Sequence, residues 1–186
     1  MNILHIDSSI QGDASASRQL SAAIADRLRR GHPNADYRHR DLIEAPTPHL
    51  TLDTVMAGDN ELLAEFLAAD TVVIGAPLYN FTIPSQLKAW FDHVIVAGRT
   101  FQYGAEGPVG LVPDKRVIVA VARGGVYAEG SPYAPYEHAE TLMRVLLGFI
   151  GVTRPEFIVA EGLKLGDEPR AAALAAASAQ VEALAT

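Results

Sequence analysis

Three serine side chains stand around one turn near the amino terminus, where together they could hold an anion. Ser9, Ser15 and Ser17 follow a short apolar segment and precede an amphipathic one, so a strand is expected to lead into a helix there. The first N–H groups of a helix are free and partly positive, and a hydroxyl adds a donor without charge. One serine would only cap the helix, but three favour a monophosphate site. Asp7 and Asp13 oppose an anion, and neither G-x-G-x-x-G nor the P-loop motif is present.

A second candidate segment is apolar and aromatic where a turn would normally be polar. Pro77, Leu78, Tyr79, Asn80 and Phe81 lie between a β-branched run at 71–76 and an amphipathic segment. In an open parallel sheet, ligands bind at the carboxyl ends of the strands, between strand and following helix. We therefore expect this loop to line a site for a flat ligand. The alternative is a hydrophobic loop that only caps the core.

Two glycine-containing segments could complete such a site. Ala122, Arg123, Gly124 and Gly125 end another buried run, and backbone N–H groups at the two glycines can point at the edge of a planar ring. Residues 98–111 hold Phe101 and Tyr103 among glycines, which predicts a hairpin beside the same crevice. A flexible surface hairpin is the alternative, but it would expose both rings to water.

Side chains for other kinds of chemistry are missing. The chain has no cysteine, which excludes disulfides, iron–sulfur clusters and thiol redox chemistry, so a redox role needs an organic cofactor. The six histidines show no metal-ligand spacing, and no metal is expected. No serine has a histidine placed as its base, which argues against a hydrolase. His93 falls within an amphipathic helix, where a structural or solvated role is expected.

The elements that must position these residues alternate along the chain. Strands are predicted at Asn2–Asp7, Asp36–Asp41, Arg116–Ala122 and residues 71–76 and 155–160. Helices are predicted from the serine turn to about Arg30, at Ser85–Val94, and over residues 59–69, 135–149 and 168–185. Residues 42–58 contain two prolines and are expected to be a loop. The charged segment Asp36–Asp41 is expected to be a solvated edge strand.

Composition indicates one domain over residues 1–186, rich enough in apolar residues to bury a core. Of the residues, 49% are hydrophobic and 20% charged, so the chain is not disordered. A net charge of -7 argues against nucleic-acid binding, which needs a basic face. There is no signal-peptide pattern and no apolar run of membrane-spanning length. A soluble cytoplasmic protein without a membrane partner is expected.

Five strands alternating with helices predict an α/β fold: a three-layer, flavodoxin-like sandwich with strand order 2-1-3-4-5 and helices on both faces. The serine turn, the aromatic loop and the glycine pair follow strands 1, 3 and 4, so they should meet at one end of the sheet. A phosphate site, a ring platform and donors for a ring edge together fit FMN.

The same residues resemble a known family, the FMN-dependent NADH azoreductases or FMN-dependent NADH:quinone oxidoreductases. The matching segments run in family order along nearly the whole chain: SSIQGDASAS at 8–17, GAPLYNFTIPSQLKAWFDHV at 75–94, AGRTFQYGAEGPVGL at 97–111, ARGG at 122–125 and LLGFIGV at 146–152. The second segment and the hairpin motif are specific. Residues 45–59 are shorter than in the family, and Tyr127 stands where some members have histidine.

The resemblance implies a role for each matching residue. Ser9, Ser15, Ala16 and Ser17 would hold the FMN phosphate, and Ala122, Arg123, Gly124 and Gly125 would contact the pyrimidine edge. Pro77, Leu78, Tyr79, Asn80 and Phe81 would pack on the isoalloxazine and hydrogen-bond to it. Phe81, Phe101, Tyr103 and Tyr127 would line the substrate slot. The family also implies a homodimer with flavin sites at the interface.

The implied activity is a ping-pong reaction in which NADH or NADPH reduces FMN, and a quinone or aromatic azo compound then takes two electrons. No protein side chain is expected to act as a covalent catalyst. Two alternatives remain open from the sequence: a flavodoxin-like electron-transfer protein, to which the acidic charge is suited, and a non-catalytic nucleotide-binding domain. Phe101 and Tyr103 favour the enzyme, because a carrier needs an exposed flavin edge.

Overall fold

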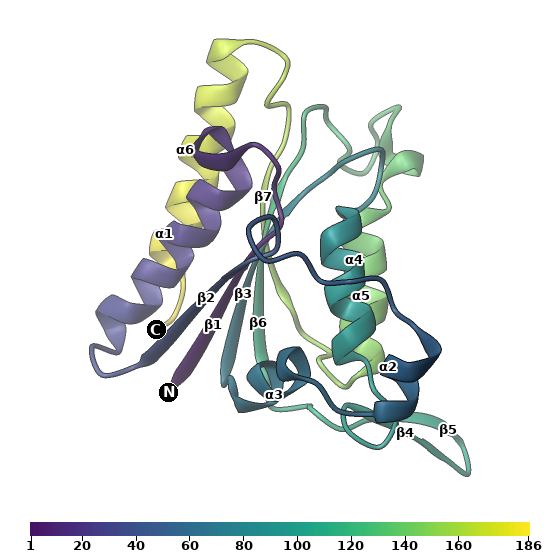
Figure 1. Ribbon diagram of the computed structural model, residues 1–186. Coiled ribbons are helices and arrows are strands. Elements are labelled where there is room, and N and C mark those ends of the chain that lie inside the picture. Colours follow the sequence, from purple (N-terminus) through teal and green to yellow (C-terminus); the bar gives the residue numbers. More distant parts are fainter.

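The computed structural model describes all 186 residues and has a five-stranded parallel sheet at its centre (Figure 1). The strand order is β2-β1-β3-β6-β7, which confirms the predicted order 2-1-3-4-5. The strands are β1 (Asn2–Asp7), β2 (Asp36–Asp41), β3 (Thr71–Pro77), β6 (Arg116–Ala122) and β7 (Glu156–Ala160). Each of the four strand pairs in this sheet is parallel, so all five carboxyl ends meet at one edge.

Helices cover both faces of the sheet, as predicted for a three-layer sandwich. Helices α1 (Ala16–Gly31) and α6 (Asp167–Ala183) pack side by side on one face. Helices α3 (Glu61–Ala68), α4 (Ser85–Val94) and α5 (Ala139–Phe149) cover the other face. Strand β3 is buried at every position, because both of its faces meet helices. This explains why its sequence is continuously apolar instead of alternating.

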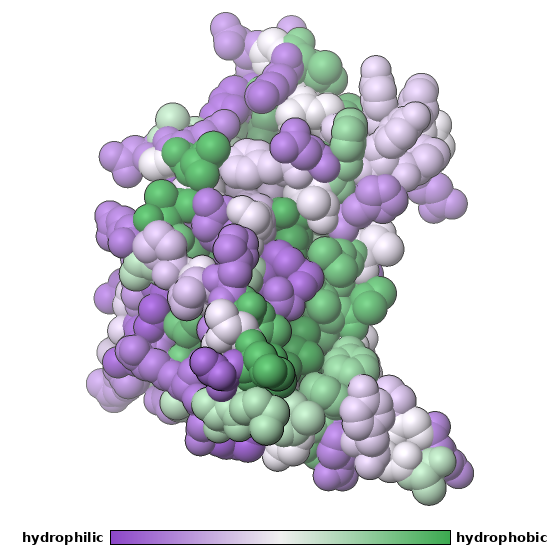
Figure 2. Space-filling model, turned by 45° about the vertical axis from the view of Figure 1, so that its right-hand side comes forward, coloured by the Kyte–Doolittle hydropathy of each residue, from purple (hydrophilic) through white to green (hydrophobic).

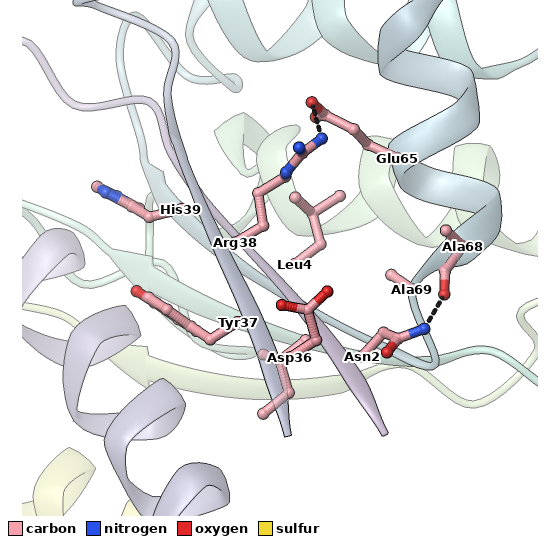
Figure 3. Close-up of a pocket in the computed structure, with 10 residues that line it drawn as sticks. Asn2, Leu4, Asp36, Tyr37, Arg38, His39, Glu65, Ala68 and Ala69 are labelled. Atoms are coloured by element: carbon pink, nitrogen blue, oxygen red, sulfur yellow. Dashed lines mark hydrogen bonds and ion pairs between the residues drawn. The ribbon is translucent and has the colours of Figure 1, made fainter. Parts of the chain in front are cut away.

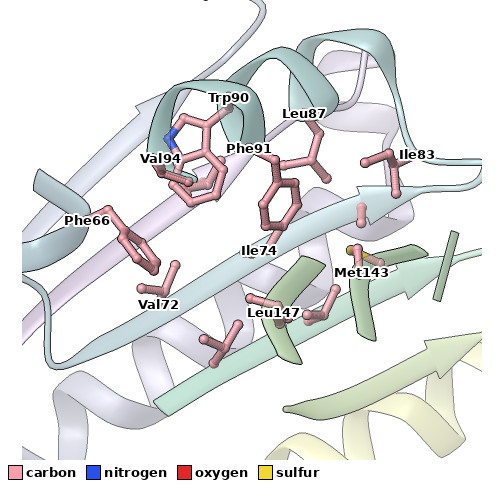
Figure 4. Close-up of a cluster of buried hydrophobic side chains, with 14 of the residues drawn as sticks. Phe66, Val72, Ile74, Ile83, Leu87, Trp90, Phe91, Val94, Met143 and Leu147 are labelled. Carbon is pink, nitrogen blue, oxygen red and sulfur yellow. The ribbon is translucent and has the colours of Figure 1, made fainter. Parts of the chain in front are cut away.

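The larger core lies under α4 and α5 (Figure 4). Trp90 and Phe91 of α4 are fully buried, and Phe66 of α3 packs edge-on against Trp90 with ring centroids 5.8 Å apart. The side chains of Met143 and Leu147 approach them from α5. These contacts fix α4 against the sheet, and with it the aromatic loop that enters this helix.

The hairpin of β4 (Phe101–Gly104) and β5 (Gly107–Gly110) lies at the amino end of the sheet (Figure 1). Helix α4 runs back from the carboxyl edge, so the segment between α4 and β6 must start at the opposite edge. Phe101 packs on Phe149 at the end of α5, with ring centroids 4.5 Å apart. The prediction that this hairpin lies beside the crevice is therefore wrong within a single chain. A parallel sheet forces this result.

Two predicted boundaries are also wrong. The predicted loop at 42–58 contains helix α2 (Leu52–Ala57), which Thr51 caps by accepting from the Thr54 N–H. Helix α5 begins at Ala139 instead of residue 135, because the Glu137 carboxylate accepts from the N–H groups of Ala139 and Glu140. A 3-10 turn, Ala134–Tyr136, precedes it. Short helices without strong periodicity leave little signal in sequence.

The arginines of the edge strand β2 are not simply solvated. Arg38 binds the carboxylate of Glu65 on α3 at 2.6 Å (Figure 3). The Arg40 Nε binds the same carboxylate at 2.7 Å. Burial would raise the pKa of Glu65, but the hydrogen bonds and charge of Arg40, with the charge of Arg38, hold that pKa below its usual value. The expected solvated edge is thus an ion-pair cluster that ties β2 to α3.

Candidate cofactor site

Three turns meet at the carboxyl end of the sheet, as the sequence predicts. They follow β1, β3 and β6, which are neighbours in the strand order. Ser9 of the first turn is hydrogen-bonded to the Tyr79 hydroxyl of the second, with 3.0 Å between their oxygens. The Leu78 N–H donates to the carbonyl of Ala122 at 2.8 Å, which joins the second turn to the third. The three segments therefore form one wall.

The serine turn offers donors that nothing in the chain uses. Ser9, Ser15 and Ser17 are buried, and the hydroxyls of Ser15 and Ser17 lie 3.0 Å apart. Ser15 caps α1 by accepting from the N–H of Arg18 at 3.3 Å. The N–H groups of Ala16 and Ser17, at the first turn of α1, have no partner in the chain. Hydroxyls and free N–H groups at a helix start are a good match for a phosphate.

Asp7 does not oppose an anion as the sequence suggested. Its carboxylate accepts from the Ser21 hydroxyl at 2.8 Å and lies 3.0 Å from the His39 Nε2. Burial acts to raise the pKa of Asp7, but contacts with His5, Ser21 and His39 outweigh it and the pKa lies below the usual value. The charge of Asp7 is therefore engaged on the α1 face of the sheet, behind the serine turn.

The aromatic loop is a two-residue turn with a strained backbone. Tyr79 and Thr82 exchange two backbone hydrogen bonds, of 2.9 and 3.0 Å. The two residues between them have positive φ, 46° at Asn80 and 73° at Phe81, as a type I′ turn requires. A bulky side chain rarely adopts this conformation. The Phe81 ring is nevertheless 47% exposed and lies 5.5 Å from the Tyr136 ring, so a large apolar face meets solvent.

The glycine turn also has free donors. The N–H groups of Gly124 and Gly125 make no hydrogen bond within the chain, while their carbonyls accept from Lys164 and Gly162 at 2.9 Å. The loop after β7 therefore fixes this turn and leaves its donors available. Tyr127 lies against it, with its ring 3.3 Å from where a β-carbon of residue 125 would stand.

Arg123 supports the turn from behind. Its side chain is 5% exposed, and its guanidinium lies 2.8 Å from Glu140, 3.3 Å from Glu137 and 3.6 Å from Glu161. These carboxylates come from α5, from the segment before it and from the end of β7. The side chain therefore ties three segments together, and the backbone N–H and carbonyl of Arg123 are held by Ala160 and Leu163.

A cleft of about 120 Å³ lies against the three turns. Seven predicted cofactor residues line it: Ser15, Ala16, Pro77, Tyr79, Ala122, Arg123 and Gly124. The sequence analysis missed four others, Gln11, Leu163, Lys164 and Arg170. On the other side of Tyr79 and Asn80, a wider groove of about 590 Å³ is lined by Ile10, Ile83 and Leu142 among others.

The two missed cations are unusual in this acidic chain. Of the 15 lysines and arginines, only Lys115, Arg154, Lys164 and Arg170 form no ion pair within 4 Å. Lys164 and Arg170 thus bring uncompensated positive charge to the cleft. The sequence held a signal for them, since residues 161–170 follow the fifth predicted strand and must start at the same sheet edge.

Two predicted slot residues lie elsewhere. Phe101 and Tyr103 are in the hairpin at the amino end of the sheet (Figure 1), so one chain does not bring them to Phe81. Tyr103 is 76% exposed and available to another surface. His93 is buried, and its Nε2 lies 3.0 Å from the carbonyl of Pro48, which confirms a structural role.

A groove of about 510 Å³ between β1, β2 and α3 is not the predicted site (Figure 3). It is lined by Asn2, Leu4, Asp36, Arg38 and Glu65 among others, and by none of the predicted cofactor residues. Arg38 and Glu65 of this groove already pair with each other. By contrast, the site at the carboxyl edge offers unpaired donors and cations beside an aromatic loop, which can hold an anionic tail and a planar ring.

No helix is both long enough and apolar enough to cross a membrane.

Comparison with known proteins identifies relatives over the whole chain. A family model described as a flavodoxin-like fold matches residues 1–185. An FMN-dependent NADH:quinone oxidoreductase of Xanthomonas campestris is 54% identical over 202 aligned residues, covering 99% of each chain. A second protein of that description, from Bradyrhizobium diazoefficiens, is 53% identical over 192 residues and 95% of each chain.

Solved structures give the same result. An azoreductase from Bacillus anthracis superposes with a TM-score of 0.87 at 32% identity, covering 99% of this chain and 100% of that one. An FMN-dependent NADH-azoreductase from the same species, solved in complex with FMN, has a TM-score of 0.86 at 26% identity, covering 98% of this chain and 96% of that one.

Proposed function

Because the chain belongs to the family of FMN-dependent NADH:quinone oxidoreductases, which has a flavodoxin-like fold, we propose that it binds FMN at the carboxyl edge of its sheet and reduces quinones with NADH. The observation that carries this proposal is the meeting of three turns, two of them with unused donors, around one cleft. Azo compounds are a second acceptor class, supported by the azoreductases among the structural relatives.

The phosphate end of FMN fits the start of α1. The free N–H groups of Ala16 and Ser17 lie at the start of α1, beside the hydroxyls of Ser15 and Ser17, which are 3.0 Å apart. Lys164 and Arg170 line the same cleft and have no carboxylate partner. A phosphate dianion would give these cations a partner, and it would meet the partial positive charge of the helix start.

The ring of FMN fits between the aromatic loop and the glycine turn. Tyr79 and Asn80 would lie along it, and the free N–H groups of Gly124 and Gly125 would donate to its polar edge. Fixed dipoles of this kind stabilise charge at a ring without reorganising. When bound, FMN supplies the redox chemistry by taking a hydride from NADH and passing two electrons to the acceptor. The chain orients the ring, excludes water from one face and leaves the Phe81 side open.

We place the substrate slot at a homodimer interface. Apolar residues gather in a band above the projecting hairpin on the face shown in Figure 2. Exposed apolar side chains on the hairpin and on α2 include Val109, Leu111, Val55 and Met56. A second copy burying this surface would bring its exposed Tyr103, with the buried Phe101 packed against it, toward the aromatic loop of the first, which no single chain can do. Analytical ultracentrifugation tests this, and a monomer at assay concentration contradicts it.

Anaerobic spectroscopy tests the activity. The FMN-loaded protein should lose its flavin absorbance on adding NADH alone, and a quinone should restore it in turn. An electron carrier would need a separate reductase for the first step, so flavin that stays oxidised with NADH refutes the enzyme. A protein that binds no FMN refutes the proposal as a whole.

The cations have their own test, in which FMN is compared with riboflavin, which lacks the phosphate. Replacing Lys164 or Arg170 with glutamine should weaken FMN binding to the flavin-free protein about 10-fold, because each loses a charge-assisted contact. Riboflavin binding should not change. Arg154→Gln is the matched control, since Arg154 is also unpaired but exposed and outside the cleft. Equal effects on both flavins would contradict the phosphate assignment.

A further inference from the structure

Two histidines and one aspartate converge on the α1 face of the sheet, away from the cofactor cleft. His5 and Asp7 lie on the same face of β1, and His39 is the register partner of His5 on β2. The Asp7 Oδ2 lies 3.0 Å from the His39 Nε2 and 3.5 Å from the His5 Nε2. One ligand atom from each residue lies within 4.8 Å of the others. We propose that His5, Asp7 and His39 bind one divalent transition-metal ion, with Zn²⁺ as the preferred occupant.

An unpartnered nitrogen points to a ligand at this position. The His5 side chain is 3% exposed, and its Nε2 is buried without a hydrogen-bond partner. At 3.5 Å, the Asp7 oxygen is too far for a normal hydrogen bond. A buried polar atom without a partner is costly, and most such atoms in folded proteins have a partner. A metal ion between His5, Asp7 and His39 would satisfy this nitrogen.

The spacing suits a tetrahedral ion. Zn²⁺ binds imidazole nitrogens and carboxylate oxygens at about 2.1 Å, which places neighbouring ligand atoms about 3.4 Å apart. The distances from Asp7, 3.0 and 3.5 Å, lie on either side of that value. Three protein ligands leave the fourth position for water. His39 is 41% exposed, so the ion has a path from solvent.

The outer contacts of these ligands are those that metal sites use. The other nitrogen of His5, Nδ1, lies 2.8 Å from the Tyr37 hydroxyl. The second oxygen of Asp7 accepts from the Ser21 hydroxyl at 2.8 Å. Such contacts hold a histidine in the tautomer that leaves its ligating nitrogen free, and they fix the carboxylate. Figure 3 shows Tyr37 and His39 projecting together from one side of β2, opposite to Arg38.

The nearby positive charge of Arg18 does not remove the site. Its Nη1 lies 3.9 Å from the Asp7 Oδ2 itself, which is beyond hydrogen-bond distance, and its guanidinium makes two shorter hydrogen bonds to Asp41. Asp41 therefore takes most of this charge, and the contacts of the Asp7 Oδ2 with the two histidines are shorter than its contact with Arg18. Histidine with one carboxylate favours borderline ions such as Zn²⁺, Co²⁺ or Ni²⁺ over Mg²⁺ or Ca²⁺.

The sequence predicts no metal here because the ligands come from two strands, which only the sheet register brings together. A bound ion would join the edge strand β2 to β1 directly below the serine turn. The proposal is independent of the cofactor assignment, since none of its ligands lines the cleft. It adds a second binding site to the chain.

Isothermal titration of untagged, chelator-treated, FMN-loaded protein with Zn²⁺ tests the site, and Co²⁺ absorption reports the geometry. We expect one ion per chain and a tetrahedral Co²⁺ spectrum. His39→Gln should abolish both, and Tyr37→Phe should weaken binding about 10-fold by removing an outer contact. Neither substitution should disturb the fold, because His39 is partly exposed and Tyr37→Phe keeps the aromatic ring. Flavin absorbance of each FMN-loaded variant verifies that it is folded. His49→Gln, at an exposed histidine outside the cluster, should bind like the wild type. No binding by the wild type, or undiminished binding by His39→Gln, overturns the proposal.

Discussion

Arg123→Met should destabilise the protein by about 3 kcal/mol, because it removes the buried cation that three partly buried carboxylates share. The guanidinium lies within 4 Å of Glu137, Glu140 and Glu161, whose side chains are only 10%, 24% and 24% exposed. Removing one partner of a buried pair costs about 3–5 kcal/mol. The lower end applies here, because water reaches Glu140 and Glu161. For a chain of this size, 3 kcal/mol lowers the melting temperature by roughly 6–12 °C.

Urea denaturation followed by circular dichroism measures this change. Lys88→Met is the matched control: Lys88 is 43% exposed in its pair with Asp92, and a surface pair contributes at most about 1 kcal/mol. FMN affinity should fall with Arg123→Met as well, since the segments held by Arg123 carry the glycine turn. The change should leave the m-value unaltered, because the unfolded surface is the same.

A second substitution separates charge repulsion from lost packing. If repulsion among the three carboxylates causes the loss, adding Glu140→Gln to Arg123→Met should recover about 1 kcal/mol, a coupling of the size seen between contacting residues. Glu140→Gln alone should destabilise. The role given to Arg123 would be refuted if Arg123→Met lowered the free energy of unfolding by less than the Lys88→Met control does. It would also be refuted if the losses of the two single variants simply added in the double variant.

Three other predictions follow from local geometry. Phe81→Gly should raise the free energy of unfolding by about 1 kcal/mol, since glycine adopts the positive φ without strain. The same change should lower kcat/KM for quinones, and an unchanged kcat/KM would show that Phe81 does not line the slot. Gly110→Ala should cost about 1–3 kcal/mol, because its β-carbon would overlap the backbone of Gly151, whereas Gly148→Ala meets nothing and should stabilise α5. The folded pKa of Glu65 is below its ordinary value of 4.5, so its stabilisation is complete above that pH and is lost as pH falls toward the lower folded value. Acid titration of the denaturation midpoint should therefore show wild type and Glu65→Gln converging below about pH 4.5.

The sheet was predictable because its signals are local. The strands β3 and β6 read as continuous apolar runs, and a proline or a glycine pair turns the chain at or just after their ends. Strand order then placed the turns after β1, β3 and β6 at one edge without any knowledge of side chains. The free N–H groups at Ala16 and Gly124 follow from the same logic, since they come from backbone geometry at strand ends.

The errors concern contacts between distant segments. Arg38 and Arg40 resemble solvated charges until α3 brings Glu65 beside them. Lys164 and Arg170 stand out only in the folded chain, where neither has a carboxylate within the 4 Å of an ion pair. His5 and His39 meet through strand register, which residue spacing cannot reveal. The hairpin error is different, because topology alone was sufficient to correct it: a helix that leaves the carboxyl edge must return the chain to the amino edge.

Because of the position of that hairpin, a change in acceptor preference and a change in cofactor binding would affect different segments of the chain. Its residues, 101–110, form a continuous segment that contributes nothing to the cleft of its own chain. Acceptor preference could then diversify by exchanging one short segment, while the parts that hold the cofactor stay fixed. A chimera carrying a relative's hairpin would inherit that relative's choice of quinone or dye and keep its own affinity for flavin.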